Sequence, residues 1–312
     1  MKKQTYCELS QLGLVRFDGD EAQIFLHNQL SCDVAGLAPG QSTYGAYCTA
    51  KGRMLASFLL WQSQQSYFMQ LPSLLCEPIQ KQLAKFILRS KVKASGASGD
   101  WSIVGVAGED AGVLVQRAVG DAPRGVHAVI HTQAAMVIRL PGNRYEIVAT
   151  RDKTTGILDT LSTGASKTDP KHWEWLEIRA GIPTITPATQ EAFVPQMVNL
   201  DLIGGVSFEK GCYPGQEIVA RMHYRGTLKQ RMYLASIAGT DSPIPGDRLY
   251  SATFGDQACG TIVNAAHAPE GGYDLLASIQ IASAEQGGVR WKAPAGPAMK
   301  ILPLPYPVTS DE

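Results

Sequence analysis

The chain has 312 residues, of which 45% are hydrophobic and 18% charged, and its 28 basic side chains balance its 28 acidic ones. This composition predicts an ordinary globular protein with two or three domains. The zero net charge excludes a global attraction to nucleic acid or membrane, so a polyanion would need a local basic patch.

The termini and cysteines favour a cytoplasmic protein. The lysines after Met1 precede no apolar run, as they would in a signal peptide, and no apolar stretch is long enough to span a bilayer. The six cysteines are scattered without a Cys-x-x-Cys pair, which is typical of a reduced compartment and offers no metal ligand set. We expect a monomer without membrane contact.

The first half of the chain mixes helical and strand periodicities. In chain order we expect a strand at 13–17, a helix at 21–30, a hairpin at 44–61, a helix after Pro72 that includes Leu75, Ile79, Leu83, Phe86 and Ile87, a loop at 95–100, a strand at 101–106, a helix at 110–119, a hairpin of 136–140 with 145–150, and a helix at 151–161. This order predicts an α+β fold with a subdomain of split βαβ type.

After Gly226 the pattern changes to short β runs separated by turns. These runs are 230–237, 248–250, 259–263, 273–279 and 299–302, and their spacing predicts a small antiparallel barrel. We therefore expect a boundary near Thr227, with domains at 1–227 and 228–312.

The segment Lys210-Gly211-Cys212-Tyr213-Pro214-Gly215-Gln216-Glu217 concentrates most of the candidate chemistry. Both glycines can adopt positive φ, which allows close backbone approach, and Pro214 suits a first helical position before a helix at 216–222. Cys212 would then lie at a helix N-terminus beside Lys210, and both neighbours favour thiolate. The alternative for a free cysteine is a small buried apolar side chain.

Other polar groups have functional and structural interpretations of similar weight. Glu217 could cap its helix or bind a ligand amide. Downstream cations around Tyr224 could bind a carboxylate or phosphates, or form a solvated face; they are Arg221, His223, Arg225, Lys229 and Arg231. Trp173 and Trp175, which precede the extended exit Gly181-Ile182-Pro183, could stack on a flat heterocycle or pack in the core.

The eight-residue segment resembles the Lys-Gly-Cys-Tyr-x-Gly-Gln-Glu signature of the YgfZ-type folate-binding, tRNA-modification-associated proteins. These are relatives of the glycine-cleavage aminomethyltransferase. The resemblance extends over nearly the whole chain through supporting segments, namely Ala50-Lys51-Gly52-Arg53, Leu88-Arg89-Ser90-Lys91-Val92, Ala180-Gly181-Ile182-Pro183 and Phe193-Val194-Pro195-Gln196.

The resemblance implies two α+β subdomains around a channel for a tetrahydrofolate-like ligand, a C-terminal barrel, and a role in maintaining iron–sulfur enzymes, including tRNA-modifying ones. It places the key cysteine at Cys212, with Lys210 beside it. Folate contacts would come from Trp173, Tyr213, Gln216, Glu217, Arg221 and Glu146. A second family tryptophan is replaced by Leu12.

Two other functions remain as alternatives. A folate-dependent aminomethyl transferase needs an acidic pair, but Ala56 and Ser57 stand at the matching positions, so Asp33 or Glu146 would have to replace it. A tRNA-binding module would use exposed cations, namely Arg89, Lys91, Lys93, Arg225 and Lys229.

Overall fold

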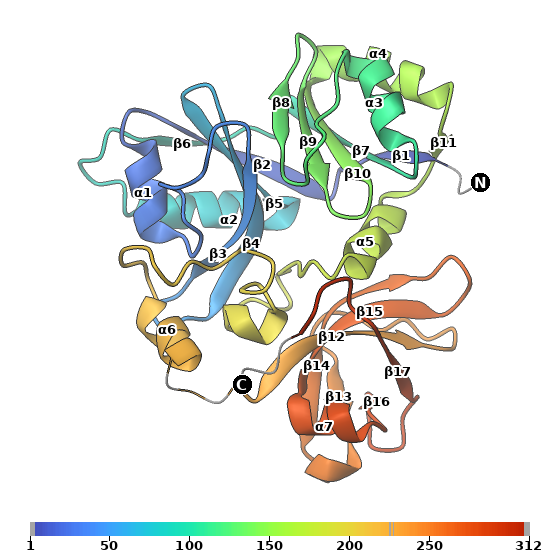
Figure 1. The fold of residues 1–312 in the computed structure, drawn as a ribbon. Coiled ribbons are helices and arrows are strands. Elements are labelled where there is room, and N and C mark those ends of the chain that lie inside the picture. Colours follow the sequence, from blue (N-terminus) through green and yellow to red (C-terminus); the bar gives the residue numbers. More distant parts are fainter. Residues whose placement is uncertain (1–3, 225, 227, 309–312) are drawn as a thin grey trace. The chain divides into compact units, whose positions relative to one another are not determined.

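The computed structural model describes residues 4–224, 226 and 228–308 (Figure 1). The chain forms two compact units. The first unit comprises Met1–Gln29, Asp33–Tyr44 and Phe58–Trp173, and the second comprises Leu30–Cys32, Gly45–Ser57 and Glu174–Glu312. The predicted boundary at Thr227 lies outside the described residues, and the division into 1–227 and 228–312 stays a prediction.

The first unit contains a six-stranded sheet in the order β11-β1-β7-β10-β9-β8. Its strands are β1 (Thr5–Glu8), β7 (Trp101–Ala107), β8 (Val129–His131), β9 (Met136–Leu140), β10 (Arg144–Thr150) and β11 (Ser166–Lys167). Helices α3 (Ala111–Val119) and α4 (Arg151–Ser162) cover one face (Figure 1), where Val104, Val106 and Ile147 join the buried core. The predicted hairpin of β9 and β10 is confirmed.

A second sheet has five strands in the order β3-β4-β5-β2-β6, and all of them come from the first half of the chain. Its strands are β2 (Leu12–Asp18), β3 (Ser42–Cys48), β4 (Met54–Ser63), β5 (Ser66–Pro72) and β6 (Lys93–Gly96), and its helices are α1 (Ala22–Gln29) and α2 (Ser73–Ala84). Strands β3 and β4 each belong partly to both units. Two expectations were wrong at their edges: α2 ends before Phe86, and β6 occupies the start of the predicted loop at 95–100.

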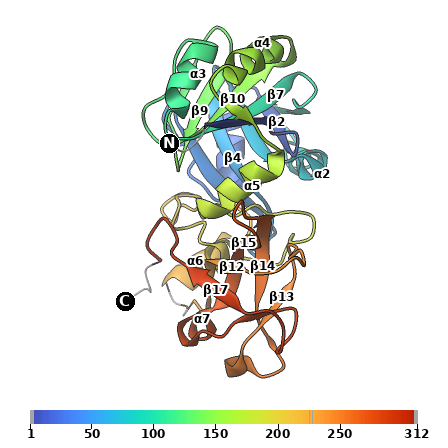
Figure 2. The same cartoon turned by 90° about the vertical axis from the view of Figure 1, so that its right-hand side faces the viewer.

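The second unit contains a six-stranded antiparallel sheet in the order β16-β13-β14-β15-β12-β17, which curls around its own core (Figures 1 and 2). Its strands are β12 (Gln230–Ile237), β13 (Arg248–Tyr250), β14 (Ala258–His267), β15 (Tyr273–Gln280), β16 (Arg290–Trp291) and β17 (Met299–Leu302). The unit also includes α6 (Gln216–Tyr224), α7 (Ile281–Gln286), and the 3-10 turns η1 (Pro195–Val198) and η2 (Ala252–Phe254). The predicted C-terminal antiparallel architecture is confirmed.

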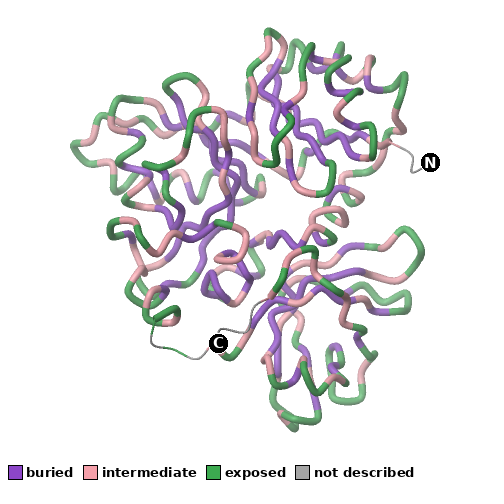
Figure 3. The backbone as a smooth tube through the Cα atoms, viewed as in Figure 1, coloured by how far each residue is buried: buried purple, intermediate pink, exposed green. Residues whose placement is uncertain are grey.

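Helix α5 (Pro170–Arg179) was not among the expected elements; its first four residues belong to the first unit and the rest to the second. Burial follows the strands of both units, while most turns are exposed (Figure 3). None of the described helices combines the length and apolar character that crossing a membrane requires.

Candidate functional site

The Lys210–Glu217 turn is seated against the β3–β4 turn of the same unit through two glycines. Gly215 has φ +83°, and a Cβ there would lie 2.6 Å from the Cα of Gly52 and also meet the carbonyl oxygen of Thr49. Gly52 itself has φ +70°. A side chain at position 215 would therefore push the two turns apart, which confirms the predicted close approach.

Two details of the predicted turn were wrong. Gly211 does not have positive φ, and a Cβ there would meet nothing within 4 Å. Pro214 is not helical, because the positive φ of Gly215 interrupts the chain and α6 begins only at Gln216. Gly215 is thus the glycine that the turn requires.

Cys212 is exposed, whereas the other five cysteines of the sequence are buried. Burial raises the pKa of the Cys48 thiol to about 12 and that of Cys76 to about 11. These buried thiols stay protonated at neutral pH. Cys212 is therefore the cysteine that an external reagent or partner can reach.

Gly215 follows Cys212 in the chain, and Lys210, which precedes it, holds the loop from the N-terminal side. Its Nζ donates a hydrogen bond of 2.6 Å to the carbonyl oxygen of Leu30 and lies 4.7 Å from the ring centroid of Tyr213, within cation–π range. Gln216 Nε2 donates to the carbonyl oxygen of Lys210 at 3.2 Å. Lys210, Tyr213 and Gln216 thus hold the loop on both sides of the exposed thiol.

Tyr213 is the buried member of this group. The residue is 6% exposed, and its hydroxyl makes no hydrogen bond with any described residue. Burial raises the pKa of this phenol, and the thiols of Cys48 and Cys32 raise it further. The tyrosine therefore acts as a neutral anchor for the loop.

Helix α6 carries the remaining candidates of the second unit on exposed positions. Glu217 and Arg221 are both exposed. At the end of the helix His223 stacks on Phe208, with ring centroids 3.8 Å apart, and Tyr224 is 65% exposed. The exposed side chains of α6 thus follow the loop that carries Cys212 directly along the chain.

The predicted basic cluster was wrong in one member. Arg231 is buried, and its Nη1 donates to both carboxylate oxygens of Asp201 at 2.8 Å and to the carbonyl oxygen of Gln196 at 3.1 Å. Burial raises the pKa of Asp201 although the arginine opposes this shift. Arg231 is therefore a structural partner in the interior, and Arg225 lies outside the described part of the chain.

The other two predicted folate residues, Glu146 and Trp173, lie together in the first unit. Glu146 is fully buried on β10, pairs with Gly105 of β7, and its Oε1 accepts a 3.0 Å hydrogen bond from Gln70 Nε2. Trp173 is 2% exposed and packs on Gly105, where a Cβ would lie 2.6 Å from its ring. The guanidinium of Arg144 lies 5.2 Å from a ring centroid of Trp173.

Two polar atoms of this buried group have no hydrogen-bond partner among the described residues, namely Trp173 Nε1 and Gln70 Oε1. Sequence reasoning missed Gln70 and Gly105; an amide inside the otherwise apolar run of β5 was the available signal. Trp175 has a different role, because its Nε1 donates to Asp274 at 2.9 Å. The two tryptophans therefore do not act as one stacking surface.

The positions of the missing acidic pair are occupied by structural residues. Ala56 is fully buried, and the Ser57 hydroxyl donates to the carbonyl oxygen of Pro183 at 3.0 Å and accepts from the Ile185 amide at 2.9 Å. Asp33 is exposed, accepts from the Gly36 amide and lies 3.3 Å from His27 Nδ1. Within the described residues no group of three or more His, Cys, Asp or Glu side chains could hold a metal ion.

The structure brings Lys210, Cys212, Tyr213 and Gln216 together in the second unit, and Trp173 and Glu146 together in the first. No protein-family model matches the chain.

Curated proteins named tRNA-modifying protein YgfZ are similar to it. The protein of Blochmanniella pennsylvanica is 31% identical over 236 residues, covering 73% of this chain and 70% of that protein. That of Colwellia psychrerythraea is 30% identical over 254 residues, covering 81% and 78%, and that of Sodalis glossinidius is 29% identical over 309 residues, covering 97% and 93%.

Among solved structures, the glycine cleavage system aminomethyltransferase T from Bartonella henselae is similar, with a TM-score of 0.81 and 15% identity. The match covers 97% of this chain and 86% of that chain. At this identity the likeness shows the fold, which is that of the aminomethyltransferase.

Proposed function

The chain belongs to the family of the tRNA-modifying protein YgfZ, and from this membership we propose that it is a cytoplasmic folate-binding protein that supports iron–sulfur enzymes, including tRNA-modifying ones, through Cys212. The exposed thiol on its braced turn is the observation that carries the proposal. A loop held by Gly215, Lys210 and Gln216 presents sulfur in one defined place, as a functional group requires.

Support for folate binding comes from the buried polar group of the first unit. A pterin ring has N–H donors beside a carbonyl, so a buried carboxylate such as Glu146 and an indole N–H such as that of Trp173 match its edge. Trp173 Nε1 and Gln70 Oε1, which have no hydrogen-bond partner in the described part of the chain, are atoms whose burial a ligand would compensate. A reduced folate bound there would supply a one-carbon carrier.

Aminomethyl transfer is the weaker proposal. That reaction requires a carboxylate for acid–base work at the folate amine. Ser57 instead uses its hydroxyl on two backbone groups, and the Glu146 carboxylate already accepts from Gln70. These residues favour binding of folate over catalysis on it.

Titration with tetrahydrofolate, followed by tryptophan fluorescence, tests the folate half. We expect a saturable quench in the wild type, and an affinity about tenfold or more lower in Glu146→Gln, because a hydrogen bond to a charged group contributes roughly 1.5–3 kcal/mol. Trp175→Phe is the matched control and should retain the quench, since that indole bonds Asp274. Absence of saturation in the wild type would contradict folate binding.

Complementation tests the thiol half. In cells that lack the protein, Cys212→Ala should fail to restore the activity of an iron–sulfur tRNA-modifying enzyme while keeping folate affinity. Cys76→Ser, a change at a buried cysteine, is the control and should restore it. Full restoration by Cys212→Ala would refute the role of the thiol and leave the folate proposal standing.

A further inference from the structure

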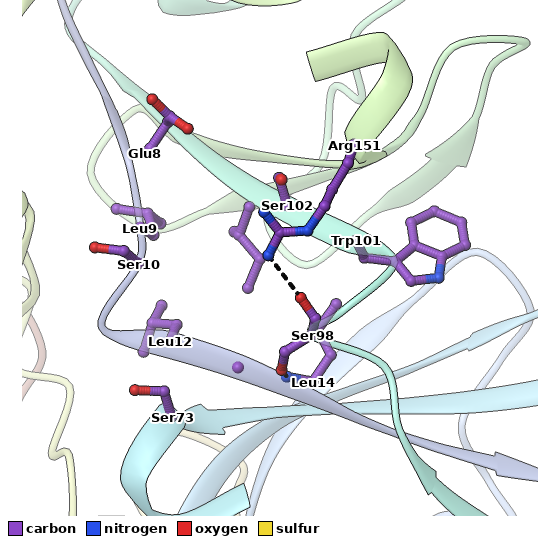
Figure 4. Close-up of a pocket in the computed structure, with 12 residues that line it drawn as sticks. Glu8, Leu9, Ser10, Leu12, Leu14, Ser73, Ser98, Trp101, Ser102 and Arg151 are labelled. Carbon is purple, nitrogen blue, oxygen red and sulfur yellow. Dashed lines mark hydrogen bonds between the residues drawn. The ribbon is translucent and has the colours of Figure 1, made fainter. Parts of the chain in front are cut away.

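A cavity of about 190 Å³ lies in the first unit, where the segment joining β1 to β2 runs beside the segment joining β6 to β7 (Figure 4). Each segment is bonded to a neighbouring strand: the Leu9 amide donates to the carbonyl oxygen of Ile103 in β7 at 2.8 Å, and the Ala97 amide donates to that of Leu14 in β2 at 2.9 Å. The walls of the cavity are thus part of the hydrogen-bonded framework of the unit.

Arg151, the first residue of α4, is fixed at the edge of this cavity. Its Nε donates to the carbonyl oxygen of Gly99 at 2.7 Å, and its Nη2 donates to that of Ser98 at 2.9 Å. A guanidinium has five N–H donors in a planar fork, so several remain for a ligand. An arginine oriented by two backbone bonds is prepared to receive a carboxylate.

Three serine hydroxyls add neutral donors to the same space. Ser10, Ser73 and Ser102 line the cavity, and Ser10 and Ser73 are exposed. Figure 4 shows Ser10 and Ser73 on one side and Ser102 beside Arg151 across from them. The cavity therefore offers hydroxyls around the cation from more than one strand segment.

An anionic group lines the opposite part of the cavity. Glu8, the last residue of β1, lies across from Arg151 in Figure 4. Its carboxylate has one ion pair, with Lys167 at 3.8 Å, and both side chains are largely exposed. An exposed ion pair of this kind contributes little to the free energy of unfolding, so the Glu8 carboxylate can bind another cation in its place.

The remaining lining is apolar and comes from Leu9, Leu12, Leu14, Ile103 and Trp101. With charged groups and hydroxyls at its exposed rim and apolar side chains in its wall, this space suits a small molecule that carries charged groups and an apolar part.

We propose that this cavity binds a small free α-amino acid with a short apolar side chain. The α-carboxylate contacts Arg151 and Ser102, the ammonium contacts Glu8 on the opposite side, and the side chain packs on Leu12. The opposite charges at the two ends select a zwitterion over a simple anion or amine. This site uses neither Cys212 nor Trp173 and does not depend on the proposed function.

Calorimetric titration of the full chain tests the proposal. The probes are glycine, L-alanine and L-valine, with propionate and propylamine carrying only one of the two charges. We expect saturable binding of at least one amino acid, and binding about tenfold or more weaker for propionate and propylamine, because each lacks one charged contact. Failure of all three amino acids to saturate, or equal binding of propionate, would overturn it.

Variants locate the site. Ser102→Ala and Arg151→Lys should each weaken the affinity for the amino acid, the latter by about tenfold or more because the planar fork is lost. Leu12→Trp should fill the cavity and abolish binding while the circular dichroism spectrum stays that of the wild type. Arg89→Lys, on an exposed turn of the same unit, is the control. Unchanged affinity in Arg151→Lys and Leu12→Trp would refute the assignment.

Discussion

Replacing Gly215 by alanine should separate the thiol loop from the β3–β4 turn. The change places a Cβ at φ +83°, which costs about 1–2 kcal/mol for an L-residue. The new atom would lie 2.6 Å from Gly52 Cα, well inside normal carbon contact, and overpacking of this kind costs about 1–3 kcal/mol. Together we expect the free energy of unfolding to fall by about 2–5 kcal/mol.

Urea unfolding compares this variant with Gly211→Ala, its matched control in the same loop. Gly211 has no positive φ and no atom within 4 Å of its Cβ position, so its replacement should change the free energy of unfolding by less than about 0.5 kcal/mol. The alkylation rate of Cys212 with iodoacetamide gives a local readout, and Gly215→Ala alone should change it. Equal stability and equal alkylation rates in the two variants would refute the contact between the turns.

Two further substitutions and one change of pH probe other parts of the molecule. Gly105→Ala should displace Trp173, shift the fluorescence emission and lower the free energy of unfolding by about 1–3 kcal/mol, because the Cβ would press on the ring. Ser57→Ala should lower it by about 1–3 kcal/mol in urea unfolding, since two buried backbone groups lose their partner. Burial, and to a smaller extent the nearby Arg144, lowers the pKa of His127 below its ordinary value of 6.5. As the pH falls, the unfolded chain therefore binds a proton at His127 before the folded protein does. The free energy of unfolding should decrease as the pH falls below about 6.5 and through the lower pKa of the folded protein.

Controls keep these three tests specific. Gly156→Ala, at an open position inside α4, should raise stability by about 0.5–1 kcal/mol, and a loss there would contradict the packing argument. Ser162→Ala, whose hydroxyl bond is exposed, should have a smaller effect than Ser57→Ala. His127→Gln should reduce the loss of stability between about pH 8 and about pH 5, and an unchanged slope would remove His127 from the acid response.

Local patterns predicted the elements well where a residue's neighbours in sequence decide its conformation. The hairpin of β9 and β10 and helix α4 lie close to their expected limits. The close approach at Gly215 was predictable because glycine pairs in a short turn have few other uses. Helix α5 was missed because its apolar residues were interpreted as leading into the extended Gly181-Ile182-Pro183, and strand β5 was missed because its continuous apolar run shows no alternation.

Long-range contacts could not be predicted from the pattern. Arg231 was expected on a basic surface because its neighbours are cationic, but Asp201, thirty positions earlier in the chain, draws it inside. Gly105 and Gln70 join Glu146 only through the pairing and facing of distant strands. Spacing along the chain gives no information about such partners, so the resemblance to a family was needed to connect Glu146 and Trp173.

The order in which the two units are built along the chain has a consequence for biosynthesis. The turn that receives Gly215 includes Gly52, and 163 residues separate them (215 − 52). At a ribosomal rate of ~5–20 residues per second, the earlier turn waits roughly 8–33 s for its partner. During that interval Met54 and Ala56, both fully buried in the finished protein, have none of the contacts that residues after 173 provide. The second unit therefore completes late in synthesis, and nascent chains shorter than 215 residues should be bound by chaperones.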